Sequence, residues 1–362
     1  MYLFASIVLT VLAALWTYIG LSLVFPLVYG TPWMWLGLLF LLVTYSLQVW
    51  RWLAYGKSDE KPKRLHAAYF SMGLMVYMMV VAIPKDIAGL FIEIPDFINL
   101  PLMIIALILN SLSMYVAHLG PAVRTVEIKT GLSGKPIHIV QISDLHIGPI
   151  IQTTYVRKVV EKIKELKPDL IVATGDIGDG QVSFLEVPLK ALGEVTKGCP
   201  SFYIPGNHEY YWNIDHWLTT MQGLGFKTLV NQGQLFDLPG KIPLWIGGVP
   251  DLQAGRFRPD HASNPAKAIS LNEAQDHYKV LLAHHPQTCL QAEKAGFDLM
   301  LCGHTHGGQF FPITLLVGFF NIYTRGLNFH GKLKVYVNVG TGFWGPPLRL
   351  GERAEITSLR LS

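Results

Sequence analysis

The 362-residue chain contains few charged residues and few cysteines. Aspartate, glutamate, lysine and arginine make up 15% of it and hydrophobic residues 51%, which is more apolar than an ordinary soluble protein. The three cysteines, Cys199, Cys289 and Cys302, follow no regular spacing, so the sequence predicts neither a disulfide framework nor a thiolate metal site. The net charge of +4 is too small to indicate a nucleic-acid partner, and we expect none.

The shortage of charge is concentrated in the first third of the chain. Four apolar segments lie there: Tyr2–Phe25, Trp33–Trp50, Ala67–Ile83 and Ile98–His118. Their lengths are close to the roughly 20 residues that a membrane-spanning helix needs. We therefore expect a four-helix transmembrane domain over residues 1–120. No ionisable residue lies at the centre of a segment, so the pattern favours an anchor over a transporter.

The basic residues of the loops predict how the chain is oriented in the membrane. Five of them lie between the second and third segments: Arg51, Lys57, Lys61, Lys63 and Arg64. The loop between the third and fourth segments has only Lys85, beside acidic residues. Because basic loops stay in the cytoplasm, we expect a multi-pass protein of the inner membrane whose second domain is cytoplasmic. If one segment were only interfacial, that domain would lie on the other face.

The rest of the sequence alternates between strand and helix patterns, after an expected linker at residues 121–135. In the second domain, residues 136–362, Pro136–Ser143 predicts a strand and Tyr155–Leu166 a helix with apolar residues at helical spacing. The later expected elements are, in order, a strand at Leu170–Ala173, a helix at Val187–Thr196, a strand at Ser201–Ile204, a helix at 214–224 and strands at 226–230, 244–248, 278–283, 298–302 and 333–338. This alternation is typical of an α/β domain.

Five of these strands end in side chains that bind metals. They are Asp144 and His146, Asp176, Asn207 and His208, His284, and His304 and His306. Because strand-end loops converge in α/β sheets, we expect these groups to meet and to supply ligands for two cations. The tight Gly175–Asp176 turn makes Asp176 the natural bridge between them. Mixed carboxylate, amide and imidazole ligands favour Mn, Fe, Zn, Ni or Co over Ca.

Two adjacent divalent ions suit the hydrolysis of phosphoesters. The substrate is anionic, and water is a poor nucleophile at neutral pH. A hydroxide that bridges two metal ions is available at neutral pH, and the metals offset the charge that develops on the phosphate oxygens. Two metal ions held by the strand-end residues would therefore suit this reaction.

The ordered set of motifs resembles the calcineurin-like metallophosphoesterases. The motifs are Asp144-x-His146, Gly175-Asp176-x-x-Asp179, Gly206-Asn207-His208-Glu209, His284 and Gly303-His304-x-His306. The resemblance covers residues 136–362, and the tail from Val337 to Arg349 resembles a bacterial, membrane-attached branch. It implies a four-layer α/β/β/α sandwich and the hydrolysis of phosphoesters.

The resemblance also implies roles for individual residues. The first metal would be held by Asp144, His146, Asp176 and His306, and the second by Asp176, Asn207, His284 and His304. His208 would donate a proton to the leaving oxygen or stabilise the transition state, and Glu209 would orient it. Four further residues are expected near the metals or the substrate: Asp179, Tyr210, Arg256 and Arg349. His285 follows His284, which we prefer as the ligand because it lies at the strand end.

A further apolar segment, Phe310–Tyr323, lies in the second domain and follows the last metal-binding motif. One interpretation is that this segment lies on the bilayer or lines a groove for an acyl chain. The other is that it forms a loop or helix packed on the sheet. We expect a membrane-anchored phosphoesterase that hydrolyses a phosphodiester or pyrophosphate of a lipid-linked substrate. The alternatives are a tethered phosphodiesterase for small or nucleotide substrates, and a receptor or scaffold without catalysis.

Overall fold

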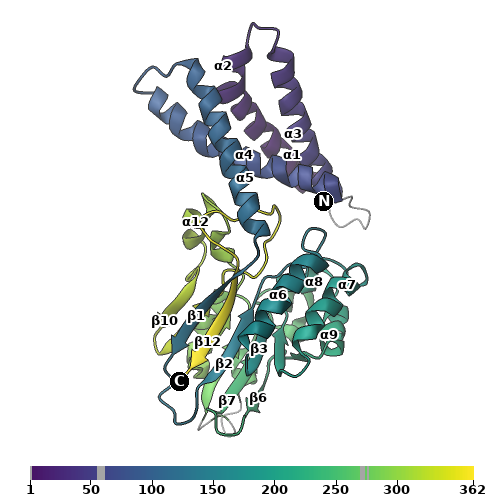
Figure 1. Cartoon of the computed structure of the whole chain (residues 1–362), viewed down its shortest axis with the longest axis vertical. Helices are drawn as coiled ribbons and strands as arrows, with labels where there is room; N and C mark the ends of the chain where they lie inside the picture. Colours follow the sequence, from purple (N-terminus) through teal and green to yellow (C-terminus); the bar gives the residue numbers. More distant parts are fainter. Residues whose placement is uncertain (1, 55–61, 270–273, 275–276) are drawn as a thin grey trace. The chain divides into compact units, whose positions relative to one another are not determined.

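The computed structural model describes all residues except 1, 55–61, 270–273 and 275–276. The chain forms two compact units, of which the first comprises Met1–Val116 and the short segment Gly345–Leu348. The second comprises Ala117–Trp344 and Arg349–Ser362. We call them the helical unit and the α/β unit, and Figure 1 shows the elements of each.

The helical unit contains four long apolar helices. In chain order its elements are α1 (Tyr2–Ile19), a π-helical turn η1 (Gly20–Val24), α2 (Phe25–Val28), α3 (Met34–Ala54), α4 (Pro62–Gly89), the turn η2 (Asp96–Ile98) and α5 (Asn99–His118). Among the described residues, four stretches are long and apolar enough to cross a membrane: Ser6–Val28, Met34–Leu53, Lys63–Gly89 and Asp96–His118. The expectation of four N-terminal helices apolar enough for membrane spans is confirmed.

Helix α4 is longer than the expected segment Ala67–Ile83, because Pro84 lies inside the helix and does not end it. Lys85, which we expected in a loop, is therefore helical and lies within a candidate span. Its ammonium group donates to the carbonyl of Ser22 in η1 and to Asn99 Oδ1, and lies 3.0 Å from Asp86 Oδ1. A charged group in a span needs such partners, and these come from three segments of the unit.

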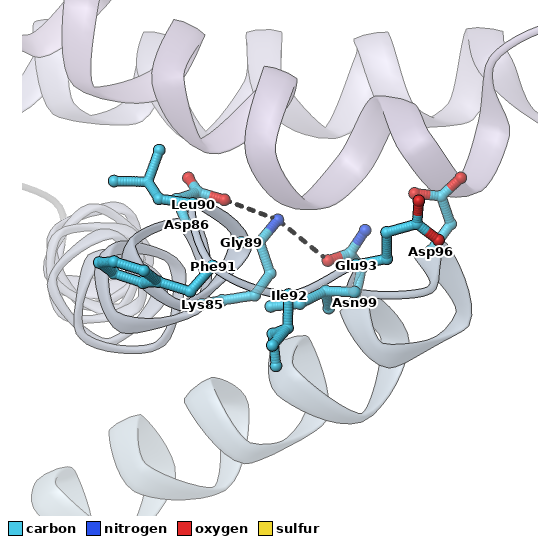
Figure 2. Close-up of a pocket in the computed structure, with 10 residues that line it drawn as sticks. Lys85, Asp86, Gly89, Leu90, Phe91, Ile92, Glu93, Asp96 and Asn99 are labelled. Carbon is cyan, nitrogen blue, oxygen red and sulfur yellow. Dashed lines mark hydrogen bonds and ion pairs between the residues drawn. The ribbon is translucent and has the colours of Figure 1, made fainter.

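The same network lies beside a cavity at one end of α4. Asp86 Oδ2 accepts hydrogen bonds from the Tyr18 hydroxyl at 2.6 Å and the Ser22 hydroxyl at 2.7 Å. The cavity has a volume of about 550 Å³ and is lined by residues from Lys85 to Asn99. Figure 2 shows the Lys85 ammonium between Asp86 and Asn99. Lys85 and Asp86 are thus bound to each other and to Tyr18, Ser22 and Asn99.

The α/β unit contains two six-stranded sheets. Sheet one has the order β1-β12-β2-β3-β4-β5, with strands at Ala122–Ile128, Glu355–Leu361, Ile137–Ile142, Leu170–Thr174, Ser201–Ile204 and Lys227–Thr228. Sheet two has the order β10-β11-β9-β8-β7-β6, with strands at Gly326–His330, Leu333–Val337, Leu299–Cys302, Tyr278–Leu282, Leu244–Gly248 and Gln232–Phe236. Strands β2, β3 and β4 are parallel, as are β7, β8 and β9.

Buried apolar side chains join the sheets into four layers. One cluster lies between the sheets and includes Val172 of β3 and Val280 of β8. A second cluster packs helices α6 (Thr153–Leu166), α7 (Val182–Leu192) and α9 (Ile214–Gly223) on the outer face of sheet one. A third packs α11 (Cys289–Ala295) on the outer face of sheet two. The predicted α/β/β/α sandwich is confirmed.

Several elements differ from the sequence-based expectation. Strand β1 lies in the stretch expected as a linker, where it pairs in parallel with the C-terminal strand β12. Helix α7 begins at Val182 rather than at Val187. Pro188 lies inside the helix and is buried on the same face as Leu185, Leu189 and Leu192, so it does not mark the start of the helix. The remaining elements are short helices and turns: η3 (Gly193–Val195), α8 (Asn207–Tyr211), α10 (Ala254–Phe257), η4 (Pro259–His261), η5 (Pro265–Ala268), η6 (Pro286–Thr288), η7 (His306–Gly308), α12 (Ile313–Leu316) and η8 (Val317–Phe319).

Candidate metal centre

The strand-end loops hold the candidate ligands in an unusual backbone conformation. Asp144, His146, Asp176, His304 and His306 all have positive φ, between 49° and 72°. This left-handed region disfavours residues with a side chain, and its use clusters at functional sites. The turns also need glycine, because a Cβ on Gly206 would lie 2.2 Å from Asp176 Oδ1 and one on Gly303 would lie 2.1 Å from Asp144 Oδ2.

The first group of ligating atoms comes from both sheets. His146 follows β2 and His306 follows β9, and their Nε2 atoms lie 3.1 Å apart. His306 Nε2 is 3.5 Å from Asp144 Oδ1. Asp144, His146 and His306 could therefore hold one metal ion, because each offers a ligand atom to a common point.

The second group contains Asp176, His284 and His304. His284 Nε2 lies 3.2 Å from Asp176 Oδ2 and 3.2 Å from His304 Nδ1. His284 Nδ1 lies 2.9 Å from the Thr174 carbonyl, and donation to this acceptor leaves the Nε2 lone pair facing the group. These three residues could hold a second ion beside the first.

Asp176 lies between the two groups. Its Oδ2 is 3.2 Å from His284 Nε2 and 3.9 Å from the Nε2 atoms of both His146 and His208. Its turn is fixed by Glu209, whose carboxylate accepts hydrogen bonds from the backbone N–H groups of Asp176, Ile177, Gly178 and Gly206 at 2.7–3.2 Å. Glu209 therefore organises the backbone of the site.

The carboxylate that contacts His208 is Asp179, which corrects the partner expected for this histidine. Asp179 Oδ1 lies 3.1 Å from His208 Nδ1 and also accepts from Trp212 Nε1 at 3.0 Å. Burial alone would lower the pKa of His208, but Asp176 and Asp179 together raise it to about 9. Glu209 could not serve as the orienting group, because both of its oxygens are occupied by backbone donors.

The residues present suit divalent cations. Asn207 Oδ1 is buried, and no described residue donates a hydrogen bond to it. Burial lowers the pKa of His146 and His304 to about 3, so that both imidazoles are neutral, the form that binds metals. Burial also raises the pKa of Asp144 to about 6. Burial therefore disfavours charge on these three residues, whereas Asp176 and His284 favour each other's charged forms across 3.2 Å. A divalent cation beside Asp176 would take the place of the His284 proton.

Comparisons with known proteins agree with this geometry. Residues 137–308 match the family model of the calcineurin-like phosphoesterases. The chain is 34% identical over 269 residues to a transmembrane protein with metallophosphoesterase domain from Danio rerio, which covers 72% of this chain and 61% of that protein. It is 33% identical over 268 residues to a metallophosphoesterase of Campylobacter jejuni, which covers 73% of this chain and 69% of the relative.

The chain belongs to the calcineurin-like metallophosphoesterase family. The candidate ligands lie within the module that matches the phosphoesterase family model. The chain spans about 61% of the length of its relative from Danio rerio.

In this metallophosphoesterase, Arg349 supports the first ligand group from behind. Its side chain is fully buried and donates to the carbonyls of His306, Val339, Gly340 and Gly342 at 2.6–3.4 Å. Its Nη2 also lies 3.3 Å from His306 Nδ1. Arg349 thus joins the ligand loop after β9 to the loop after β11.

Two other expected substrate residues lie away from the ligand groups. Tyr210 is buried in a small apolar cluster with Ile214 and Ala254, and its hydroxyl lies 2.8 Å from His261 Nδ1. The cause is its place in α8, which turns this side chain toward the core. Arg256 is exposed on α10.

Three functional candidates were missed or only partly recognised from the sequence. The half-exposed rings of Tyr211 and Trp344 lie 5.2 and 5.9 Å from the His208 ring and form a rim beside it. Asp251 is buried after β7, and none of the described residues donates to its Oδ2. The strand Leu244–Gly248 followed by Asp251 was the available signal, because it repeats the pattern of the other strand ends.

Proposed function

We propose that this chain is a membrane-anchored hydrolase that uses two divalent metal ions to cleave a phosphodiester or pyrophosphate bond of a lipid-linked substrate. The observation that carries the proposal is the pair of ligand groups that meet at Asp176, in a chain with four candidate membrane spans. Metal dependence and phosphoester hydrolysis follow from the family. Our proposal adds that two ions are bound, that the substrate carries a lipid tail and that the protein lies in the inner membrane.

The first ion would be held by Asp144, His146, Asp176 and His306, and the second by Asp176, Asn207, His284 and His304. The central position of Asp176 and the partnerless Oδ1 of Asn207 support this division. When bound, two such ions would lower the pKa of a water molecule and offset the charge on phosphate oxygens. Any of Mn, Fe, Zn, Ni or Co would suit this set.

His208 is placed to hold a proton for the leaving oxygen. Asp179 fixes its Nδ1 side, and its Nε2 faces the site, 3.9 Å from Asp176 Oδ2. Burial opposes the charged form of His208, but Asp179, which is not a proposed ligand, favours the protonated imidazole through its contact with Nδ1. Asp179 acts as the positioning residue, and Glu209 keeps the Asp176 turn in place.

The lipid-linked substrate is inferred from the membrane helices and from the half-exposed rim of Tyr211 and Trp344. Anchoring raises the local concentration of substrates in the same membrane. The basic residues between the second and third spans favour a cytoplasmic catalytic unit at the inner membrane. A second candidate is a nucleotide-type phosphodiester, because the same exposed rings could stack on a base.

The experiment uses the full chain, purified in detergent, with its metals determined. Asp176→Asn should lower turnover of a chromogenic phosphodiester by roughly a thousandfold and reduce the bound metal, because one carboxylate oxygen is lost from both ligand groups. Asp237→Asn, on the exposed surface, is the matched control.

Full metal loading of the unmodified chain without turnover of any ester would instead favour the scaffold alternative. A screen of membrane lipid extracts against nucleotide diesters then separates the two substrate classes. A clear preference for soluble diesters would refute the lipid assignment while leaving the metal assignment intact.

A further inference from the structure

The segment from Phe310 to Thr324 presents a large apolar surface on the α/β unit. It contains no charged residue. Leu315 is 67% exposed, Phe319 82% and Phe320 77%. Leu316 and Ile322 are also exposed, so that the apolar side chains gather on α12, η8 and the residues that follow. Contiguous exposed apolar surface of this kind marks an interaction site.

Both ends of this segment are attached to the ligand loop. At its start, Phe310 follows His306–Gln309 directly, and a Cβ on Gly308 would lie 2.6 Å from the Cα of Thr314. At its end, the carbonyl of Thr324 accepts a hydrogen bond from the hydroxyl of Thr305 at 2.6 Å. Thr305 lies between the ligands His304 and His306. The apolar surface is therefore fixed beside the metal centre.

The partner of this surface must be apolar and within reach. Only three residues, 119–121, separate the end of α5 from the start of β1. Three extended residues span roughly 10 Å, so a bilayer that holds α5 lies close to the α/β unit. A charge-free surface rich in leucine and phenylalanine is also what interfacial segments bury at the boundary of headgroups and acyl chains.

We propose that the face formed by Leu315, Leu316, Phe319, Phe320 and Ile322 docks into the lipid bilayer that holds the chain's own helices. Docking there places the loop of His304 and His306 at the lipid surface, where the substrate's phosphoester would be presented. The role of this face in substrate delivery rests on the proposed function, the hydrolysis of a lipid-linked substrate. The docking itself requires no catalysis.

The test labels single cysteines with bimane in the full chain, reconstituted in vesicles of phosphatidylcholine and phosphatidylglycerol that carry doxyl-labelled lipid. Cys199→Ala removes the one cysteine that is not buried. Leu316→Cys reports on the proposed surface. Leu132→Cys is the control, because the two leucines are 45% and 39% exposed and Leu132 lies between β1 and β2, at the end of sheet one away from the metal centre.

We expect lipid quenching at residue 316 to be at least about twofold stronger than at residue 132. Equal quenching at the two positions overturns the proposal. So does protection of residue 316 from iodide without lipid quenching, which would identify a second copy of the chain as the occupant. Because the same measurement can be made on Asp176→Asn, failure of docking is distinguishable from failure of catalysis.

A second arm measures delivery of the substrate. Leu315→Ser with Phe319→Ser should lower the ratio of turnover on a micellar ester to turnover on a soluble ester by about tenfold, while Leu132→Ser leaves the ratio unchanged. An unchanged ratio in the double variant contradicts the role of this surface in presenting lipid substrates.

Discussion

The helical unit and the α/β unit use buried polar groups in different ways. In the helical unit the described contacts pair donors with acceptors, as where Gln48 Nε2 donates to the Ser71 hydroxyl and that hydroxyl donates to the Thr44 carbonyl. In the α/β unit, ligating atoms of the same kind face one another, as do the Nε2 atoms of His146 and His306 at 3.1 Å. The first arrangement joins a donor to an acceptor, although atoms such as Gln48 Oε1 keep no partner among the described residues, whereas the second brings like ligand atoms together and suits a cation.

The electrostatics of the metal centre lead to the same distinction. Burial lowers the pKa of His146 to about 3 and raises that of Asp144 to about 6, so neither group readily carries its own charge. Asp176 and His284 do pair across 3.2 Å, whereas the imidazoles of His146 and His306 present like ligand atoms to each other. The comparison suggests that buried atoms aimed at a common point distinguish a binding site from a structural network.

Removing the metals is expected to have the largest effect. Chelation should abolish hydrolysis and lower the unfolding temperature of the α/β unit by several degrees, because ions present at about 1,000 times their Kd stabilise the folded state by about 4 kcal/mol. Thermal unfolding measured before and after chelation, and after metal is restored, checks this prediction. An unchanged unfolding temperature in protein shown to be metal-free would contradict it.

The pH dependence of metal binding provides the control for that experiment. Asp144 must be ionised to bind metal, and its pKa is raised to about 6. Metal affinity should therefore be retained above about pH 6 and decrease as the pH falls below it, because protons then compete for the carboxylate. Chelation of the Asp176→Asn variant should shift its unfolding temperature less than that of the unmodified chain.

Replacing Arg349 tests the connection behind the first ligand group. Arg349→Lys should weaken metal binding by about 10- to 100-fold, because one ammonium cannot reproduce the guanidinium contacts with four carbonyls. Calorimetric titration of metal into the stripped protein measures the effect. Arg256→Lys, at an exposed position, is the matched control and should bind metal normally. Equal affinities in the two variants would show that Arg349 only stabilises the fold.

The opposite behaviour is expected in the helical unit. Lys85→Met should destabilise the chain in detergent by about 2 kcal/mol, because Asp86 and Asn99 lose a donor, but it should not change metal content. Lys85→Met combined with Asp86→Leu should recover part of the loss, since a removed pair costs less than a broken one. Lys63→Met, at an exposed position, is the control. Loss of metal in Lys85→Met would contradict the view that the polar network of the helical unit is separate from metal binding.

Much of the site could be predicted because its ligands follow strands with strong sequence patterns. Val140 and Val172 lie in β-branched runs that end at Asp144 and Asp176, and parallel strands bring such ends to one edge. The four apolar helices were predictable for a similar reason, since their length and composition are local properties. The metal-binding motifs of the family also occur in a fixed order along the chain, so the resemblance could be recognised without a structure.

Other features depend on contacts that the sequence does not reveal. The role of Glu209 is set by four backbone N–H groups from two loops, and that of Asp179 by the ring of His208. Strand β1 forms only because β12, from the other end of the chain, pairs with it. Trp344 reaches the rim through a loop far from His208 in sequence.

The smallest expected effect concerns His285, which lies next to a ligand. His284 is fully buried, and its Nε2 faces Asp176. The ring of His285 instead lies 4.3 Å from the ring of His304, and its Nδ1 accepts a hydrogen bond from the N–H of Gln287. His285→Ala should therefore lower turnover by only about threefold, because it removes packing against one ligand and no ligand atom.

The matched variant is His284→Ala, which should remove most of the activity and reduce the metal content, since the lost imidazole belongs to the second ligand group. Metal analysis separates the two histidines more directly than the rate does, because a packing residue changes activity without removing an ion. If His285→Ala lost metal while His284→Ala kept it, the ligand would be His285. The imidazole held by the Thr174 carbonyl would then belong to a structural network, like those of the helical unit.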